Sequence, residues 1–442
     1  MNVRRSTPIR DLEFTVNILP ARFACLVALL ALSAVGCGTA SPASSFDAHQ
    51  RFEAPAQPAI DVRISIQPEH RRQQQRYIAA ALAALKQSSE WLGPFDHASL
   101  TIVDPPWQGA TTAGGTDVIV IDRTPWWSAS TSMTPELAVA RAVSRRRWAE
   151  AMPGGSLPSW FVQGLVEYSA RRAIVPLFEA ENLSPGYAFL EQPFFGGFVH
   201  WFVRIRLLAE TDGEPLQAYR ANPAANPALQ PPSAADARSL EAKSVLTLGT
   251  LERWVGRPVF DQLVSTLVRQ SRYGRRTLGD FSRIATDVSG QDLSWLFDET
   301  FGSARTFDYG IGRLTSERQP EGAFGTVVVV RRFGEAVFTG TSAPPIGSFE
   351  SGRGIAVRVV FEDGQQRDDY WDGRAREKTF RYRSPARAAS AMVDPDRTLL
   401  LDLQQTNNSM TLAPRARTAA TLWAARWMAW LEHALLNYGA LV

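Results

Sequence analysis

The chain of 442 residues has very few cysteines and histidines, and this limits its metal chemistry. Its two cysteines, Cys25 and Cys37, both lie near the N-terminus. The rest of the chain can therefore form neither a disulfide framework nor a cysteine-based zinc site. The histidines are far apart in the sequence, which excludes most local histidine motifs that bind a metal. They are His49, His70, His97, His200 and His433.

The chain also lacks a concentrated excess of positive charge. It has 47 basic and 44 acidic residues, and beyond residue 37 the balance is 43 to 42. A nucleic-acid-binding protein uses concentrated positive charge to neutralise phosphates, so no nucleic-acid partner is expected. Apolar residues make up 45% of the chain, which is enough to bury large cores and excludes wholesale disorder. The length favours two or three domains.

The N-terminal segment predicts export. Basic residues precede an apolar run over 23–35, and Ala34-Val35-Gly36-Cys37 resembles a bacterial lipobox. We expect residues 1–37 to be a signal peptide with a lipidated Cys37, and residues 38–58 to be a flexible tether. The protein would then be an exported, membrane-anchored lipoprotein on the periplasmic or outer-membrane side. Cleavage without lipidation, or a short buried helix, are the alternatives.

The first half of the remaining chain alternates between strand and helix patterns. Period-two runs predict strands at 60–66, 99–103 and 118–121, and apolar residues at helical spacing predict helices at 71–92, 134–151 and 158–173. Together these predict an α/β domain over 59–185. A strongly apolar helix at 194–208 and helices over 240–301 predict a helical domain over 186–310. Within it, the segment 212–236 is rich in Pro, Ala and Asn and predicts a flexible loop.

From residue 325 onward the period changes to two, which favours a β-sandwich over 322–412. The expected strands are 327–330, 355–361, 379–382 and 399–403, with a hairpin turn at 362–364. The last segment, 418–442, predicts an amphipathic helix that carries Trp423, Trp427 and Trp430. The expected fold class is α+β.

A motif in the helix expected at 158–173 bears on function. Residues 157–168 read Leu-Pro-Ser-Trp-Phe-Val-Gln-Gly-Leu-Val-Glu-Tyr. They resemble the Trp-x-x-Glu-Gly-x-x-x-Tyr helix of the gluzincin metallopeptidases, most closely the membrane alanyl aminopeptidase family. Gln163 stands where that family has a zinc-binding glutamate. The family's His-Glu-x-x-His ends nineteen positions earlier, and this spacing places it on residues 140–144.

At these positions the zinc chemistry is missing. Two histidines at i and i+4 aim two imidazoles at one ion, but Ala140 has no donor atom and Ser144 offers only a neutral hydroxyl. Gln163 offers an amide oxygen without the charge of a carboxylate. Arg141 falls on the family's general base and stays protonated, so it accepts no proton. We therefore expect no zinc and no other cofactor.

The resemblance covers roughly residues 65–410. Residues 243–256, beginning with Lys243, are similar to the family helix that starts Tyr-x-Lys-Gly, and the tyrosine position falls on Glu241. Residues 289–297 match the family's Ser-Gly-x-Asp-Leu-x-Trp-x-Phe helix. The family's large N-terminal β-domain and its Gly-x-Met-Glu-Asn motif are missing. The resemblance implies a thermolysin-like α/β domain, a helical domain and a C-terminal β-sandwich.

These observations favour a pseudopeptidase with a binding or scaffolding role at the cell envelope. The candidate ligand-binding residues of its cleft are Arg141, Arg145, Gln163 and Lys243, and peptide ends or other anions are the candidate ligands. We also expect Arg141 to pair with Glu241. A peptide or protein partner would bind in the cleft or at the helix 418–442.

Two alternatives stay open. One is an active zinc aminopeptidase that recruits His97 and His200 as ligands. The other is an envelope assembly protein that acts through its β-sandwich and C-terminal helix.

Overall fold

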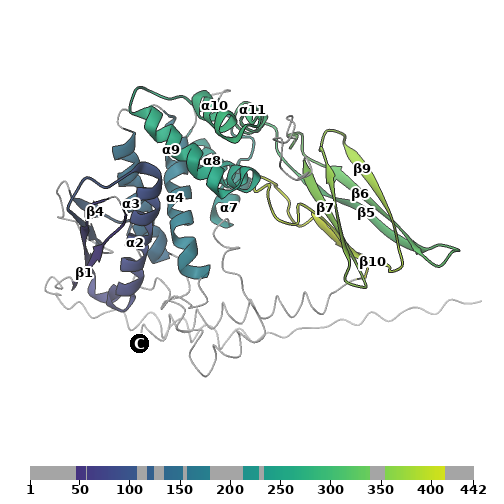
Figure 1. The fold of residues 1–442 in the computed structure, drawn as a ribbon, viewed down its shortest axis with the longest axis horizontal. Coiled ribbons are helices and arrows are strands. Elements are labelled where there is room, and N and C mark those ends of the chain that lie inside the picture. The colour runs from purple at the N-terminus through teal and green to yellow at the C-terminus, as the bar shows by residue number, and fades with distance from the viewer. Residues whose placement is uncertain are drawn as a thin grey trace, which may run out of the picture. The chain divides into compact units, whose positions relative to one another are not determined.

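The fold is seen in a computed structural model of the chain (Figure 1). It describes residues 46–55, 57–106, 117–123, 134–152, 157–179, 213–227, 233–338 and 354–413, which belong to one compact unit. They form a mixed α+β structure, as expected. The expected signal peptide with Cys37, the helix expected at 194–208 with His200 and the helix expected at 418–442 lie outside these residues. Within the described ranges, no helix combines the length and apolar character needed to cross a membrane.

The N-terminal sheet has the strand order β1-β2-β3-β4. Its strands are β1 (Phe46–Phe52), β2 (Ile60–Ile66), β3 (Ser99–Val103) and β4 (Val118–Val120). Strands β2, β3 and β4 run parallel, and β1 is antiparallel to β2. The expected tether over 38–58 is wrong for β1, which pairs along the whole edge of β2 and buries Ala48 and Phe52. Pairing satisfies the backbone groups of both strands, which fixes β1 in place despite the small residues and prolines before and after it.

Three long helices pack beside this sheet. They are α2 (Gln74–Leu92), α3 (Thr134–Ala151) and α4 (Ser159–Glu179), and a short 3-10 turn, η1 (Pro68–Gln73), precedes α2. Arg76 on α2 and Glu136 on α3 form a buried, bidentate ion pair with distances of 2.6 and 2.7 Å. This pair fixes α3 against α2. The expected helix over 134–151 is confirmed.

The next helices are α7 (Gly213–Ala221), α8 (Ala234–Val255), α9 (Arg257–Ser271), α10 (Leu278–Ser289) and α11 (Ser294–Phe301). The expected loop over 212–236 is wrong for α7. Leu216 and Tyr219, three residues apart, are both buried in the hydrophobic core of the helices. The Pro-rich composition that favoured a loop lies after α7. A capping box between Ser233 and Asp236 then starts α8.

Two antiparallel sheets form the C-terminal β-sandwich. One has the order β5-β6-β9 and the other β11-β10-β7-β8. The strands are β5 (Tyr309–Arg318), β6 (Phe324–Arg332), β7 (Ile355–Phe361), β8 (Gln366–Trp371), β9 (Glu377–Ser384), β10 (Ala388–Val393) and β11 (Ser409–Thr411). The sandwich therefore begins at Tyr309, before the expected boundary at 322. The expected turn at 362–364 is confirmed, with Gly364 at a φ of 84°.

The expected strand over 399–403 is wrong. These residues form turns with a single bridge between Phe307 and Asp402. The carboxylate of Asp394 accepts hydrogen bonds from the backbone N–H groups of Thr398 and Leu399, both at 2.8 Å. These hydrogen bonds satisfy the backbone locally, so the apolar run is buried without joining a sheet.

Candidate functional site

An open cleft of about 230 Å³ lies among helices α3, α4, α7 and α8 and the end of β4. Its polar lining residues are Asp122, Arg141, Arg145, Gln163, Glu167, Arg171, Glu214, Arg238 and Glu241. Its apolar lining residues are Val166, Pro215, Ala218, Ala242 and Val245. Of the expected site residues, the structure brings Arg141, Arg145, Gln163 and Glu241 together here.

Helical spacing explains which side chains reach the cleft. Arg141 and Arg145 lie one turn apart on α3, and Gln163, Glu167 and Arg171 follow at the same spacing on α4. Residues at i and i+4 share a helix face, so each helix presents one polar stripe to the cleft.

Gly164 lets α4 approach α8 closely behind this stripe. A Cβ atom added at Gly164 would lie 2.4 Å from the Cβ of Ser244 and 3.2 Å from the carbonyl oxygen of Glu241. No side chain fits there without moving one of the helices. The close approach of α4 and α8 therefore depends on glycine at this position.

A ring of ion pairs forms one wall of the cleft. Arg141 donates to both carboxylate oxygens of Glu167, at 2.5 and 2.8 Å, and to Glu214 at 3.0 Å. Arg171 donates to the same two glutamates, at 2.5 and 2.7 Å. Two guanidinium groups and two carboxylates thus neutralise one another, and the ring ties α3, α4 and α7 together.

The ring also fixes the charge of its members. Burial alone would raise the pKa of Glu167, but its hydrogen bond to Arg141 and the charges of Arg141 and Arg171 outweigh burial and lower it. Burial likewise opposes the charge of Arg141, yet Glu167 and Glu214 raise its pKa. Glu167 therefore stays ionised at neutral pH and is a poor proton acceptor.

Four further charged residues line the cleft outside the ring. Arg145 lies 3.9 Å from Asp122, which is a long and exposed contact. Arg238 and Glu241 lie three residues apart on α8, and neither forms an ion pair with another described residue. Burial and the neighbouring Glu167 raise the pKa of Glu241, against the opposing charges of Arg141, Arg238 and Arg145.

The expected pairing of Arg141 with Glu241 is wrong. Both side chains line the cleft, but Arg141 uses its donors on Glu167 and Glu214. Glu214 belongs to α7, in the segment that composition predicted to be a loop. Its contact with Arg141 therefore could not be anticipated.

Two of the expected motif positions, Ala140 and Ser144, face away from the cleft. Ala140 is completely buried in the core that also contains the N-terminal sheet. Ser144 is buried beside Trp91 of α2 and Ser169 of α4. At 3.6 residues per turn, one residue rotates a helix by about 100°. The family spacing, counted back from Gln163, predicts that residues 140 and 144 face the cleft. The structure instead places Arg141 and Arg145 there, one position later on α3.

Lys243, expected in the cleft, lies outside its lining. The side chain is completely buried, and its ammonium group donates to the carbonyl of Ala225 at 3.3 Å. Burial lowers the pKa of Lys243 to about 8. Its place in the structure supports a packing role rather than ligand binding.

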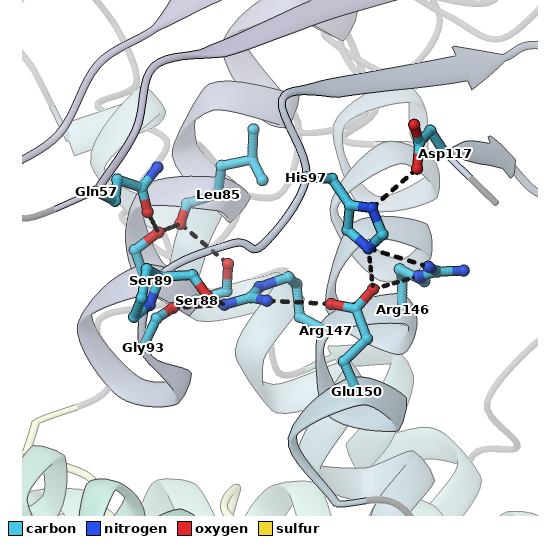
Figure 2. A network of polar contacts seen from close by, with 11 residues as sticks. Gln57, Leu85, Ser88, Ser89, Gly93, His97, Asp117, Arg146, Arg147 and Glu150 are labelled. Atoms are coloured by element: carbon cyan, nitrogen blue, oxygen red, sulfur yellow. Dashed lines mark hydrogen bonds and ion pairs between the residues drawn. The ribbon is translucent and has the colours of Figure 1, made fainter.

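His97, the described histidine proposed as a recruited zinc ligand, also lies outside the cleft lining. Figure 2 shows its ring between Asp117 and Glu150, at 2.9 Å from Nδ1 and 3.5 Å from Nε2, respectively. Arg146 and Arg147 donate to the same glutamate at 2.5 and 3.1 Å. This network connects α3 to the residue that precedes β4.

The cleft residues do not fit a zinc ion. Arg141 and Arg145 hold the cleft-facing positions of α3 at the i, i+4 spacing of paired ligands, and a guanidinium has no lone pair to donate. Gln163 adds only a neutral amide. Nowhere in the described ranges do three or more His, Cys, Asp or Glu side chains gather as metal ligands would.

Sequence reasoning missed five polar residues of the cleft: Asp122, Glu167, Arg171, Glu214 and Arg238. The i, i+4 spacing of residues 163, 167 and 171 was a usable signal for two of them. The others come from separate elements, and only the packing of the chain brings them to the cleft.

No family model matches the chain, and no curated protein matches it. Among solved structures, the chain is similar to a Legionella pneumophila aminopeptidase A in complex with aspartic acid. The similarity covers 81% of this chain and 38% of that chain, with 13% identity and a TM-score of 0.48. The present chain thus spans well under half the length of that aminopeptidase.

Proposed function

We propose that the protein is a non-hydrolytic binding protein on a gluzincin-like scaffold, and that its cleft binds an anionic group. The observation that carries this proposal is the position of Arg141 and Arg145 on the cleft face of α3. In the family that the sequence resembles, this face holds the metal. Here it holds two permanent cations in place of metal ligands: Arg141 is neutralised by the ion-pair ring, and Arg145 stays available to an anion.

The two accessible arginines, Arg145 and Arg238, supply the binding charge. A guanidinium presents several N–H donors in one plane, which suits a carboxylate or another oxyanion. The ion-pair ring holds the neighbouring Arg141 in place, so the wall of the cleft is preorganised and little ordering entropy is lost on binding.

Hydrolysis has little support from the residues present. Activation of a water molecule needs a metal ion or a proton acceptor beside it. Glu167 is held in its ionised form by two arginines, Glu241 lines the cleft with no described ion-pair partner to orient it, and no described group of side chains suits a metal. We therefore assign the cleft a role in recognition.

The sequence further supports a membrane anchor at Cys37 as part of this proposal. Cells that express the full chain would be labelled with a radioactive fatty acid and fractionated. We expect a labelled protein in the membrane fraction, and Cys37→Ala should abolish the label and release the protein. An unlabelled, soluble wild type would contradict the anchor without affecting the cleft.

The binding proposal is tested with the purified full-length chain and simple anions. Calorimetric titration with acetate, inorganic phosphate and an acetylated dipeptide acid should show binding of at least one anion, weakened at least tenfold by Arg145→Gln or Arg238→Gln. Arg269→Gln, an exposed arginine on α9 outside the cleft, is the matched control and should change nothing.

Metal analysis and peptidase assays complete this test. The protein should neither retain stoichiometric zinc after incubation and desalting nor cleave aminoacyl or peptide substrates. One tightly bound zinc together with chelator-sensitive peptide hydrolysis would overturn the proposal.

A further inference from the structure

We infer that the cleft recognises the carboxyl-terminal residue of a peptide, with a small apolar side chain. The terminal carboxylate lies between Arg145 and Arg238, and the side chain contacts the apolar floor. This inference rests on the proposed anion-binding function and specifies the ligand. The observation behind it is that the same cleft combines accessible arginines with an apolar floor.

The floor is a continuous apolar surface made by two helices. Val166 on α4 and Ala242 and Val245 on α8 are all buried, at 3–5% exposure, and they line the cleft directly. Pro215 and Ala218 of α7 continue this surface. Only a small part of the buried side chains remains exposed to the cleft, and a ligand with an apolar part covers it, whereas a bare inorganic anion does not.

The size of the cleft favours a single residue. Its volume of about 230 Å³ is below the roughly 300–1,000 Å³ of pockets that enclose drug-sized ligands. An extended peptide would not fit inside, but its last residue would. Gln163 is exposed at the same wall and offers an amide donor and acceptor, which match the peptide bond before that residue.

The balance of charge favours a carboxylate over a doubly charged anion. The ring of Arg141, Glu167, Arg171 and Glu214 is neutral by itself. The remaining cations, Arg145 and Arg238, share the cleft with the acids Asp122 and Glu241. For a phosphate dianion both the attraction to the two arginines and the repulsion from the two acids double, so the cleft offers no net gain that would offset the larger cost of removing a dianion from water.

The test compares matched ligands on the full-length chain by calorimetry. The ligands are acetyl-Gly-Val with a free carboxylate, its carboxamide, acetyl-Gly-Gly with a free carboxylate, and inorganic phosphate. We expect the Gly-Val acid to bind at least tenfold more tightly than each of the other three. Arg145→Gln and Arg238→Gln should each weaken it at least tenfold, and Arg269→Gln should leave it unchanged. Both cleft arginines are exposed, so these variants should keep the wild-type melting temperature.

The outcomes separate this inference from the function on which it rests. If phosphate or acetyl-Gly-Gly binds as tightly as the Gly-Val acid, in an arginine-dependent manner, the ligand class is wrong and the anion cleft stands. If the carboxamide binds as tightly as the acid, or if the arginine variants bind like the wild type, the inference is overturned. If no anion binds at all, both the inference and the proposed function are overturned.

Discussion

Glu167→Gln is the sharpest test of the ion-pair ring, because Glu167 is the residue that joins its two arginines. Its side chain is only 12% exposed, and it accepts from Arg141 and Arg171 at 2.5–2.8 Å. Glutamine has nearly the same shape but no charge. The substitution therefore removes the charge without opening a cavity.

The expected loss of stability depends on the charges that remain in the ring after the substitution. Removing one partner of a buried ion pair costs about 3–5 kcal/mol, because the other charge is stranded. Here both arginines keep Glu214, and Arg141 is 24% exposed, so part of the loss is recovered. We expect Glu167→Gln to lower the free energy of unfolding by about 2–3 kcal/mol at pH 7.

The pH dependence gives an independent check. The folded state lowers the pKa of Glu167, so its contribution is present above the usual glutamate pKa and is lost as the pH falls through the lowered value. The difference in the free energy of unfolding between wild type and variant should therefore be largest at pH 7 and shrink in strong acid. A variant whose deficit stays constant down to pH 3 would show that the charge of Glu167 is not what stabilises the ring.

Urea unfolding followed by circular dichroism and tryptophan fluorescence measures these free energies, in a cycle with Arg141→Gln. The double variant should be less destabilised than the sum of the two single variants, because the residues contact each other directly. Arg269→Gln combined with Arg141→Gln is the control, since Arg269 lies on α9 outside the cleft, and it should be close to additive. Additive energies for Arg141 and Glu167, or a cost below about 1 kcal/mol for Glu167→Gln, would refute the ring.

Three other substitutions test the surroundings of the cleft. Gly164→Ala should destabilise by about 1–3 kcal/mol in urea, because its methyl group would lie 2.4 Å from the Cβ of Ser244; a loss below about 0.5 kcal/mol would contradict the close packing of α4 and α8. Glu241→Gln should gain stability relative to wild type as the pH rises from the usual glutamate pKa through the raised pKa of Glu241, since a carboxylate with a raised pKa disfavours the folded state once it ionises, and an unchanged difference would argue against this. Glu252 accepts a hydrogen bond from the hydroxyl of Tyr168, and burial raises the pKa of Glu252 to about 7. Wild-type stability should therefore fall as the pH rises from the usual glutamate pKa to about 7 and level off above it, and Glu252→Gln should flatten this slope; parallel pH profiles would count against it.

Local patterns alone determined much of the secondary structure. The alternation in 60–66 fixes β2 because every second side chain of that strand is buried. Glu362-Asp363-Gly364 fixes the turn between β7 and β8, because Gly364 adopts a φ of 84° there. The helix around Trp160 follows from apolar spacing. Such signals depend on residues that are neighbours along the chain, so the sequence displays them directly.

The tertiary structure decided the cleft. Counting back from Gln163 across a loop cannot fix the rotation of α3, and an error of one position exchanges the buried Ala140 for Arg141 in the ring. Arg141 meets Glu167 at a separation of 26 residues and Glu214 at 73. Composition had assigned the segment around Glu214 to a loop. Contacts over such distances depend on how the helices pack, which no local pattern records. Arg141 and Arg145 could thus be identified as candidates from the sequence, whereas the contact of Arg141 with Glu214 and the presence of Arg238 in the same cleft could not.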